Sequence, residues 1–104
     1  EKASHNLCGG IYSIAAPKLN MSYPPLTWQT YDIDFKAAKY DDKGKKTAPA
    51  TMSVWHNGVL IHKDQKLPKR TTASPEGESP KPGAVFFQNH GHIVVYRNVW
   101  AVEK

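Results

Sequence analysis

The sequence predicts an all-β protein made of short antiparallel strands. Eight Pro and seven Gly among 104 residues disfavour long helices, and an aromatic content of 11% favours strands. Apolar residues form short runs, or alternate with polar ones, and turn residues separate these segments. The 39% hydrophobic content is typical of a globular chain, here one domain over residues 1–104. No apolar run is long enough for a membrane-spanning helix.

The first part of the chain contains two expected strands. Residues 10–16 predict a short strand that ends at Pro17, because proline lacks the backbone N–H that a strand needs. After a loop at Tyr23-Pro24-Pro25, the run over residues 28–35 alternates between polar and apolar residues from Thr30 onward. One face carries Tyr31, Ile33 and Phe35, and the other carries Thr30, Asp32 and Asp34. This pattern predicts a strand with one face buried.

The clearest local signal is a hairpin over residues 52–62. Asn57-Gly58 is the preferred pair for a two-residue type I′ turn, because both positions need a positive φ. With that turn, the expected cross-strand pairs are His56–Val59, Trp55–Leu60, Val54–Ile61 and Ser53–His62. His56 and His62 then lie on opposite faces and do not converge on one ion. Both faces carry apolar groups, so the hairpin is either covered on both sides or binds a partner through its aromatic face.

The second part of the chain begins with a long exposed connection at residues 68–83, which hold four Pro and two Gly and almost nothing apolar. Residues 84–88 and a turn at 89–91 follow. A strong strand is then expected over residues 93–102, in which Val94, Tyr96 and Trp100 alternate with Val95, Arg97 and Val99.

The net charge of +5 raises the possibility of a nucleic-acid or anion surface. The Lys clusters at 43–46 and 63–70 lie in expected loops without interleaved aromatic residues, so we expect solvated loop charge and no nucleic-acid partner. Cys8 is the single cysteine, permits no internal disulfide, and has the small and apolar neighbours of a buried residue. A phosphate-binding Gly-rich loop, a Cys-x-x-Cys pair and a Ser nucleophile elbow are absent, so no cofactor is expected.

Five segments resemble the second half of the 3-keto-disaccharide hydrolase domain. They are Cys8-Gly9-Gly10-Ile11-Tyr12, Trp28-Gln29-Thr30-Tyr31-Asp32-Ile33, His56-Asn57-Gly58-Val59-Leu60, Phe87-Gln88-Asn89-His90-Gly91 and Tyr96-Arg97-Asn98-Val99-Trp100. The resemblance implies a concanavalin-like jelly-roll sandwich of two antiparallel sheets, of which this chain is a partial or half domain. We therefore expect another chain or a preceding segment to complete the sandwich.

The resemblance also implies cleavage, or binding, of glycosides oxidised at C3. A ketone at C3 acidifies the C2 proton, so a base can remove it and the C1 oxygen leaves by β-elimination. His90 is the best candidate base and Arg97 the best electrostatic partner. Gln88 and Asn89 are candidates to bind sugar hydroxyls, and Tyr12 and Trp28 to stack on the sugar ring.

Each candidate has a structural alternative. His90 suits a tight turn in which its ring caps backbone groups, and Arg97 could pair with Asp32 or Asp34. His90 and His92 share one side of an extended strand, but a third metal ligand is not positioned by the sequence, so no metal is expected. The alternative function is a non-catalytic structural or accessory subunit that packs against another chain. By family resemblance we expect an exported protein, periplasmic or extracellular.

Overall fold

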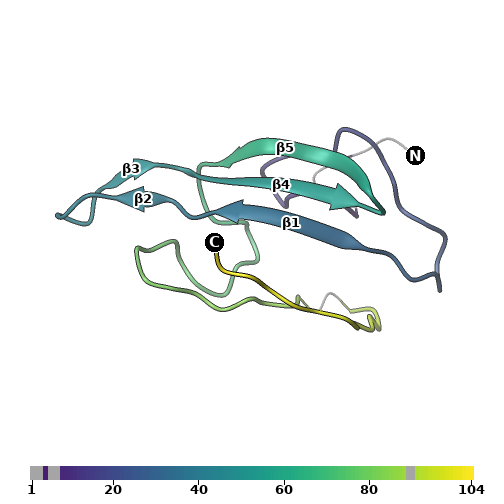
Figure 1. Ribbon diagram of the computed structural model, residues 1–104. Helices are drawn as coiled ribbons and strands as arrows, with labels where there is room; N and C mark the ends of the chain where they lie inside the picture. Colours follow the sequence, from purple (N-terminus) through teal and green to yellow (C-terminus); the bar gives the residue numbers. More distant parts are fainter. Residues whose placement is uncertain (1–3, 5–7, 89–90) are drawn as a thin grey trace.

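The computed structural model describes residues 4, 8–88 and 91–104. Its centre is a three-stranded antiparallel sheet of β1 (Tyr31–Lys36), β4 (Ala50–His56) and β5 (Val59–Leu67), in the order β1-β4-β5. A two-stranded ribbon of β2 (Lys39–Tyr40) and β3 (Lys46–Ala48) extends the sheet at one end (Figure 1). The described residues form no helix, so the predicted antiparallel all-β class is confirmed. They also contain no helical segment long and apolar enough to cross a membrane.

Strand β1 follows the predicted alternation. Its register against β4 pairs Tyr31 with His56, Ile33 with Val54 and Phe35 with Met52, which places these apolar groups on one face. The predicted burial of that face is wrong, because Tyr31, Ile33 and Phe35 are 46%, 59% and 57% exposed. β1 is an edge strand, and only part of its apolar face is covered.

The hairpin of β4 and β5 turns where the sequence predicts. Asn57 and Gly58 have φ values of 52° and 81°, and the predicted pairs His56–Val59 and Trp55–Leu60 form. The next predicted pairs are wrong, because Val54 faces His62. The cause is a register shift that puts an extra residue into β5. His62 therefore shares the face of Val54 and His56, and the prediction of opposite faces for the two histidines is also wrong.

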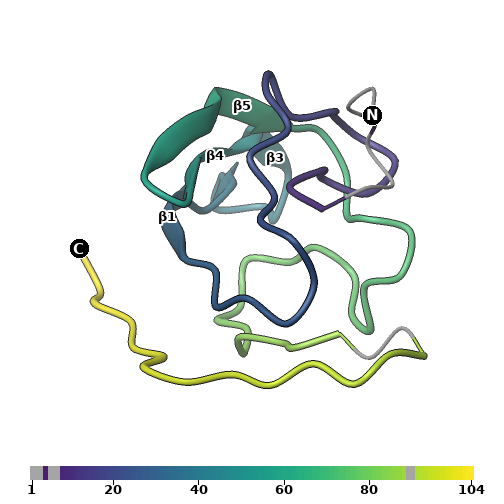
Figure 2. The ribbon, with the colours of Figure 1, turned by 90° about the vertical axis from the view of Figure 1, so that its right-hand side faces the viewer.

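The core lies where the N-terminal segment crosses the sheet (Figure 2). Its buried hydrophobic side chains are Ile11, Ala50, Val54 and Ile61. The strand expected over residues 10–16 is instead a turn, in which the Ile11 N–H donates to the Ala15 carbonyl and Ser13 has a φ of 61°. These bonds close within the segment, and Lys18 N–H then donates to the Ile61 carbonyl at 3.0 Å.

The C-terminal part of the chain runs outside the sheet. Residues 68–83 form a mostly exposed connection, and residues 91–104 run alongside β1 without pairing with it (Figures 1 and 2). The strand predicted over 93–102 is wrong because the segment has no hydrogen-bonded neighbouring strand, which a β conformation requires. A Lys104–Asp34 ion pair of 3.2 Å holds its end near β1.

Candidate functional site

Arg97 lies on the ring of Trp28. The guanidinium carbon is 3.9 Å from the ring centroid, which is a cation–π contact, and Trp28 is 49% exposed. Two of the predicted site residues, 69 positions apart in sequence by their numbers, therefore lie together. A guanidinium that lies over an aromatic face keeps N–H groups that can still donate to an oxygen. The alternative partner Asp34 pairs with Lys104, and the ion pairs of the described residues do not include Arg97.

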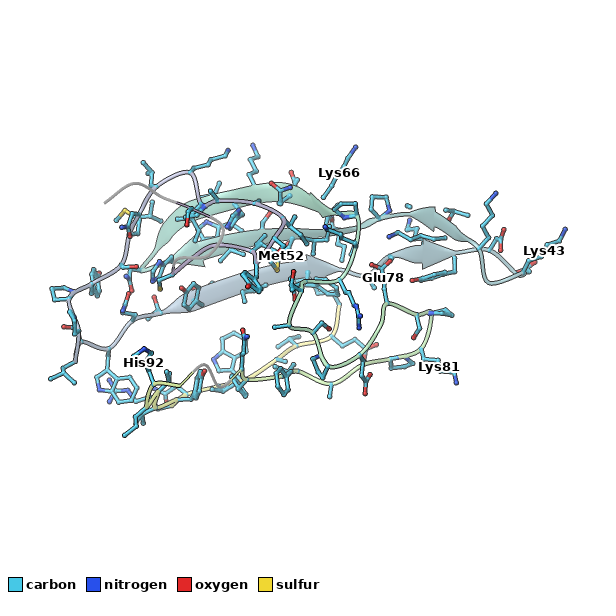
Figure 3. All side chains as sticks on the ribbon, turned by 180° about the vertical axis from the view of Figure 1, so that it is seen from behind. Lys43, Met52, Lys66, Glu78, Lys81 and His92 are labelled. Atoms are coloured by element: carbon cyan, nitrogen blue, oxygen red, sulfur yellow. The ribbon has the colours of Figure 1, made fainter. Side chains whose placement is uncertain are left out.

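An open cavity of about 490 Å³ is lined by residues of the segment that precedes Arg97 in the chain. Its lining includes Phe87, Gln88, His92, Ile93, Val94 and Tyr96. The ring centroids of Phe87 and Tyr96 are 4.5 Å apart and the ring planes form an angle of 48°. This contact brings the two ends of the cavity-lining segment together. Figure 3 shows His92 on this segment, away from the three-stranded sheet.

The remaining predicted site residues are not brought together by the described contacts. His90 and Asn89 lie outside the described residues. Tyr12 lies in the turn between Ile11 and Ala15, is 40% exposed, and is not among the described residues that line the cavity with Gln88. Within the described part of the chain, no group of three or more His, Cys, Asp and Glu residues could hold a metal ion.

Asn57 joins the hairpin turn to the loop that carries Trp28. Its backbone N–H donates to the Thr30 carbonyl at 2.9 Å, and its side-chain Oδ1 accepts from the Thr30 N–H at 3.0 Å. Its Nδ2 donates to the Met21 carbonyl at 2.6 Å and to Gln29 Oε1 at 3.3 Å. Both ends of the loop from Met21 to Thr30 are thus fastened to one side chain.

Gln29 Oε1 connects this turn to a buried histidine. It accepts from the Tyr23 N–H at 3.0 Å and from Asn57 Nδ2, and it lies 2.9 Å from His56 Nε2. Because an amide oxygen can only accept, His56 carries its proton on Nε2, and the buried Nδ1 has no hydrogen-bond partner in the described structure. Burial lowers the pKa of His56 below the ordinary value of 6.5.

Tyr31 covers His56 from β1. Their rings stack with centroids 4.4 Å apart and planes 5° from parallel. The Tyr31 hydroxyl meets Cys8 Sγ at 3.0 Å, and loss of solvent, followed by this hydrogen bond, raises the pKa of Tyr31 above its usual range. Cys8 itself is exposed, so its predicted burial is wrong.

A smaller cavity of about 230 Å³ lies next to this stack, lined by Ile11, Tyr31, Ile33, Met52, Val54 and His62 among others. His62 Nε2 lies 2.6 Å from the carbonyl oxygen of Gly9, to which it donates.

The sequence did not predict the Gln29–His56–Asn57 network, although all three residues fall in motifs that carry the family resemblance. The sequence predicts only a turn role for Asn57, because the spacing of the polar residues does not indicate its side-chain contacts.

Comparisons with known proteins agree on a carbohydrate-related family. The model of the 3-keto-alpha-glucoside-1,2-lyase-like domain matches residues 1–102, which is nearly the whole chain. No curated protein matches. A crystal structure of a candidate glycosyl hydrolase from Parabacteroides distasonis ATCC 8503 is similar, with a TM-score of 0.63 and 25% identity.

The two chains differ greatly in extent. The similarity to the Parabacteroides protein covers 76% of this chain but 34% of that one, so this chain spans about a third of that relative. The fold that the two share is an antiparallel all-β arrangement consistent with part of a jelly roll. The chain therefore belongs to the family of 3-keto-alpha-glucoside-1,2-lyase-like domains.

Proposed function

We propose that this chain takes part in the cleavage of glycosides whose sugar carries a ketone at C3, with Arg97 and Trp28 at the centre of the sugar site. The observation that carries the proposal is the Arg97–Trp28 contact of 3.9 Å, which combines a fixed positive charge with a half-exposed indole. Sugars stack on such rings through their apolar face, and a fixed guanidinium stabilises a negative oxygen. The family match and the similarity to a candidate glycosyl hydrolase support a carbohydrate substrate at the level of the family.

The proposed reaction is a β-elimination. A base takes the proton from C2, and the electrons of the C2–H bond form an enolate whose negative charge rests on the C3 oxygen. The ketone then re-forms as a C1–C2 double bond is made and the C1–O bond breaks, and the leaving oxygen takes a proton. Water adds across the double bond to complete hydrolysis. Arg97 stabilises the enolate oxygen, and His90, by family resemblance, is the base.

The other proposed contacts are to sugar hydroxyls and to a second ring. Gln88, which lines the cavity, can donate and accept hydrogen bonds with hydroxyl groups, and the amide of Asn89, the next residue in sequence, has the same donors and acceptor. Tyr12 offers another aromatic platform at a residue that is 40% exposed. The assignment of Gln88 rests on the family motifs together with the cavity, and those of Asn89 and Tyr12 rest on the family motifs.

Release of nitrophenol from a 3-keto-α-glucoside tests the function. We expect release from the 3-keto substrate and none from the matched α-glucoside, because only the ketone acidifies C2. Replacing hydrogen by deuterium at C2 should slow release if proton removal limits the rate. His90→Ala should abolish release with an unchanged melting temperature, and Arg97→Leu should reduce it more than Arg97→Lys. Equal cleavage of both glucosides would contradict the proposal.

Exposed apolar surface favours a second candidate function, that of a binding half that packs against further polypeptide. Large hydrophobic side chains are exposed on β1 and along the C-terminal segment, namely Tyr31, Ile33, Phe35, Val85, Phe86, Ile93, Val94, Val95, Val99, Trp100 and Val102. A surface of this extent is typical of an interface. We propose that residues 1–104 form a partial sandwich, equivalent to the C-terminal half of the family domain, that other strands complete.

Sedimentation velocity separates the two candidates. A binding half should self-associate when alone, because its apolar face has no cover, and should then show no turnover. A stable monomer that cleaves the 3-keto substrate would exclude the second candidate.

Export to the periplasm or the outside of the cell is a further proposal from the family, and fractionation of the source cells tests it.

A further inference from the structure

We propose that Asn57, acting through Gln29, is the residue that positions Trp28 and therefore Arg97. The inference rests on the proposed function only where it concerns sugar binding. Asn57 makes four hydrogen bonds to the loop from Met21 to Thr30, two through its side-chain nitrogen, one through its side-chain oxygen and one through its backbone.

The turn alone does not require asparagine. A type I′ turn accepts glycine or aspartate at the position of Asn57 with little strain, because each tolerates the left-handed region. Only asparagine supplies an acceptor to the Thr30 N–H and donors to the Met21 carbonyl and Gln29 Oε1. The side-chain identity at 57 is therefore set by the loop, beyond what the turn needs.

Gln29 transmits this restraint to Trp28. Three groups from different parts of the chain converge on Gln29 Oε1: the Tyr23 N–H, Asn57 Nδ2 and His56 Nε2. These three contacts restrain the rotamer of Gln29 and, through it, the backbone at residue 29. Trp28 is the preceding residue, so the backbone that carries its ring is held next to the restrained Gln29.

Arg97 depends on that placement. Its described contact is the cation–π interaction with Trp28, and the segment around it forms no strand. A cation–π contact weakens when the ring turns or retreats. Loss of the side-chain hydrogen bonds of Asn57 or Gln29 should therefore move both the Trp28 ring and the Arg97 charge that rests on it.

The ring current of Trp28 gives a readout that does not need turnover. Because the Arg97 guanidinium lies over the indole, protons of the Arg97 side chain should resonate upfield. The Trp28→Ala variant gives the chemical shift of the same protons without a ring current. We expect Asn57→Gly, which keeps the turn and removes every side-chain bond, to lose more than half of the upfield shift. Gln29→Leu should do the same, whereas Gln29→Glu keeps the acceptor oxygen and should retain the shift.

Asp41→Ala is the matched control. Asp41 is a turn residue of the other hairpin, and its Oδ1 accepts from the N–H groups of Lys43 and Lys45 at 2.9 and 2.8 Å. Its loss removes a comparable side-chain-to-backbone network far along the sheet and should leave the Arg97 shift unchanged. If folded Asn57→Gly keeps the full shift, or Asp41→Ala reduces it as much, the positioning role is overturned. If Asn57→Gly does not fold, the Gln29→Leu and Gln29→Glu pair decides by the same criterion.

Sugar titration separates this inference from the proposed function. In the wild-type protein, methyl 3-keto-α-glucoside should perturb the Arg97 side-chain resonance, and Asn57→Gly should weaken that response by several-fold. Absence of any response, with the variant shifts as expected, would overturn the sugar site and leave the positioning role intact. A response that is equally strong in wild type and Asn57→Gly would overturn the link between the two.

Discussion

His56 combines full burial, a fixed tautomer and a stacked aromatic neighbour. Its side chain is 0% exposed, its Nε2 proton points to Gln29, and Tyr31 lies parallel to its ring. Protonation would place a positive charge on Nδ1, which is buried and has no partner. The neutral form of His56 is therefore favoured in the folded chain, and its charge state couples stability to pH.

Stability should fall on acidification through this residue. The folded pKa of His56 lies below the unfolded value of 6.5, so the unfolded chain takes up the proton first. Stability is therefore complete above pH 6.5 and declines below it until the folded pKa is reached, by at most about 1.4 kcal/mol per pH unit for one proton. Urea unfolding at a series of pH values measures this decline.

Two variants isolate the contribution of His56. His56→Phe keeps the stacked ring without a titrating group and should show a shallower acid decline than wild type. His56→Leu removes both the titrating group and the ring that stacks on Tyr31, and should show the same shallow decline with a lower overall stability. An unchanged slope in His56→Phe would assign the acid sensitivity to other groups.

Gly9 is expected to tolerate no side chain. A Cβ there would lie 3.0 Å from Ile61 Cδ1, and the residue has a φ of +85°. Gly9→Ala should cost about 1–3 kcal/mol from overpacking, in addition to the left-handed strain of about 1 kcal/mol. Gly44→Ala is the control, because its φ is +78° but its Cβ would meet nothing within 4 Å. Equal losses in thermal unfolding would show that the close approach at Gly9 is unimportant.

At the scale of elements, local patterns predicted what local geometry decides. The Asn57-Gly58 turn, the alternation of β1 and the irregular connection at 68–83 follow from residues near each other in sequence. The face of His62 does not, because a one-residue shift in β5 reverses the side chains beyond it, and alternation carries no mark of such a shift. Residues 93–102 have a strand sequence but lack the neighbour that would make them a strand.

The 68–83 connection is fastened to the β2–β3 ribbon at one point. Lys46 Nζ lies 2.7 Å from Glu78 Oε1 and donates to the Pro68 carbonyl at 2.9 Å, while the Tyr40 hydroxyl donates to the same carboxylate. Both side chains are partly exposed, so the ion pair contributes only about 0–1 kcal/mol to global stability. Its main effect is to hold the loop locally.

Glu78→Ala should release that loop without unfolding the sheet. We expect limited proteolysis within residues 68–83 to become several-fold faster, with a change in unfolding free energy below about 1 kcal/mol. Glu76→Ala, two residues away in the same connection, should leave the cleavage rate near that of wild type. A large loss of stability in Glu78→Ala would mean that the connection is part of the core.

For the whole molecule, family motifs predicted more of the candidate site than composition did. Arg97 and Trp28 were both named from those motifs, but their contact joins segments that hydrophobic periodicity cannot relate. The apolar face of β1 was expected to be buried, and it is exposed because the described residues pack over only part of that face. Burial depends on packing partners from the whole fold. The alternation along one strand therefore predicts which face is apolar but not what covers that face.

Calorimetric titration of methyl 3-keto-α-glucoside into His90→Ala protein tests the sugar site most directly, because binding is then separated from turnover. We predict that the 3-keto sugar binds more tightly than methyl α-glucoside. Adding Arg97→Leu should weaken 3-keto binding by roughly tenfold, which is about 1.4 kcal/mol, and should affect the unoxidised sugar less. Equal affinity for the two sugars, unchanged by Arg97→Leu, would contradict a site built on Arg97 and Trp28.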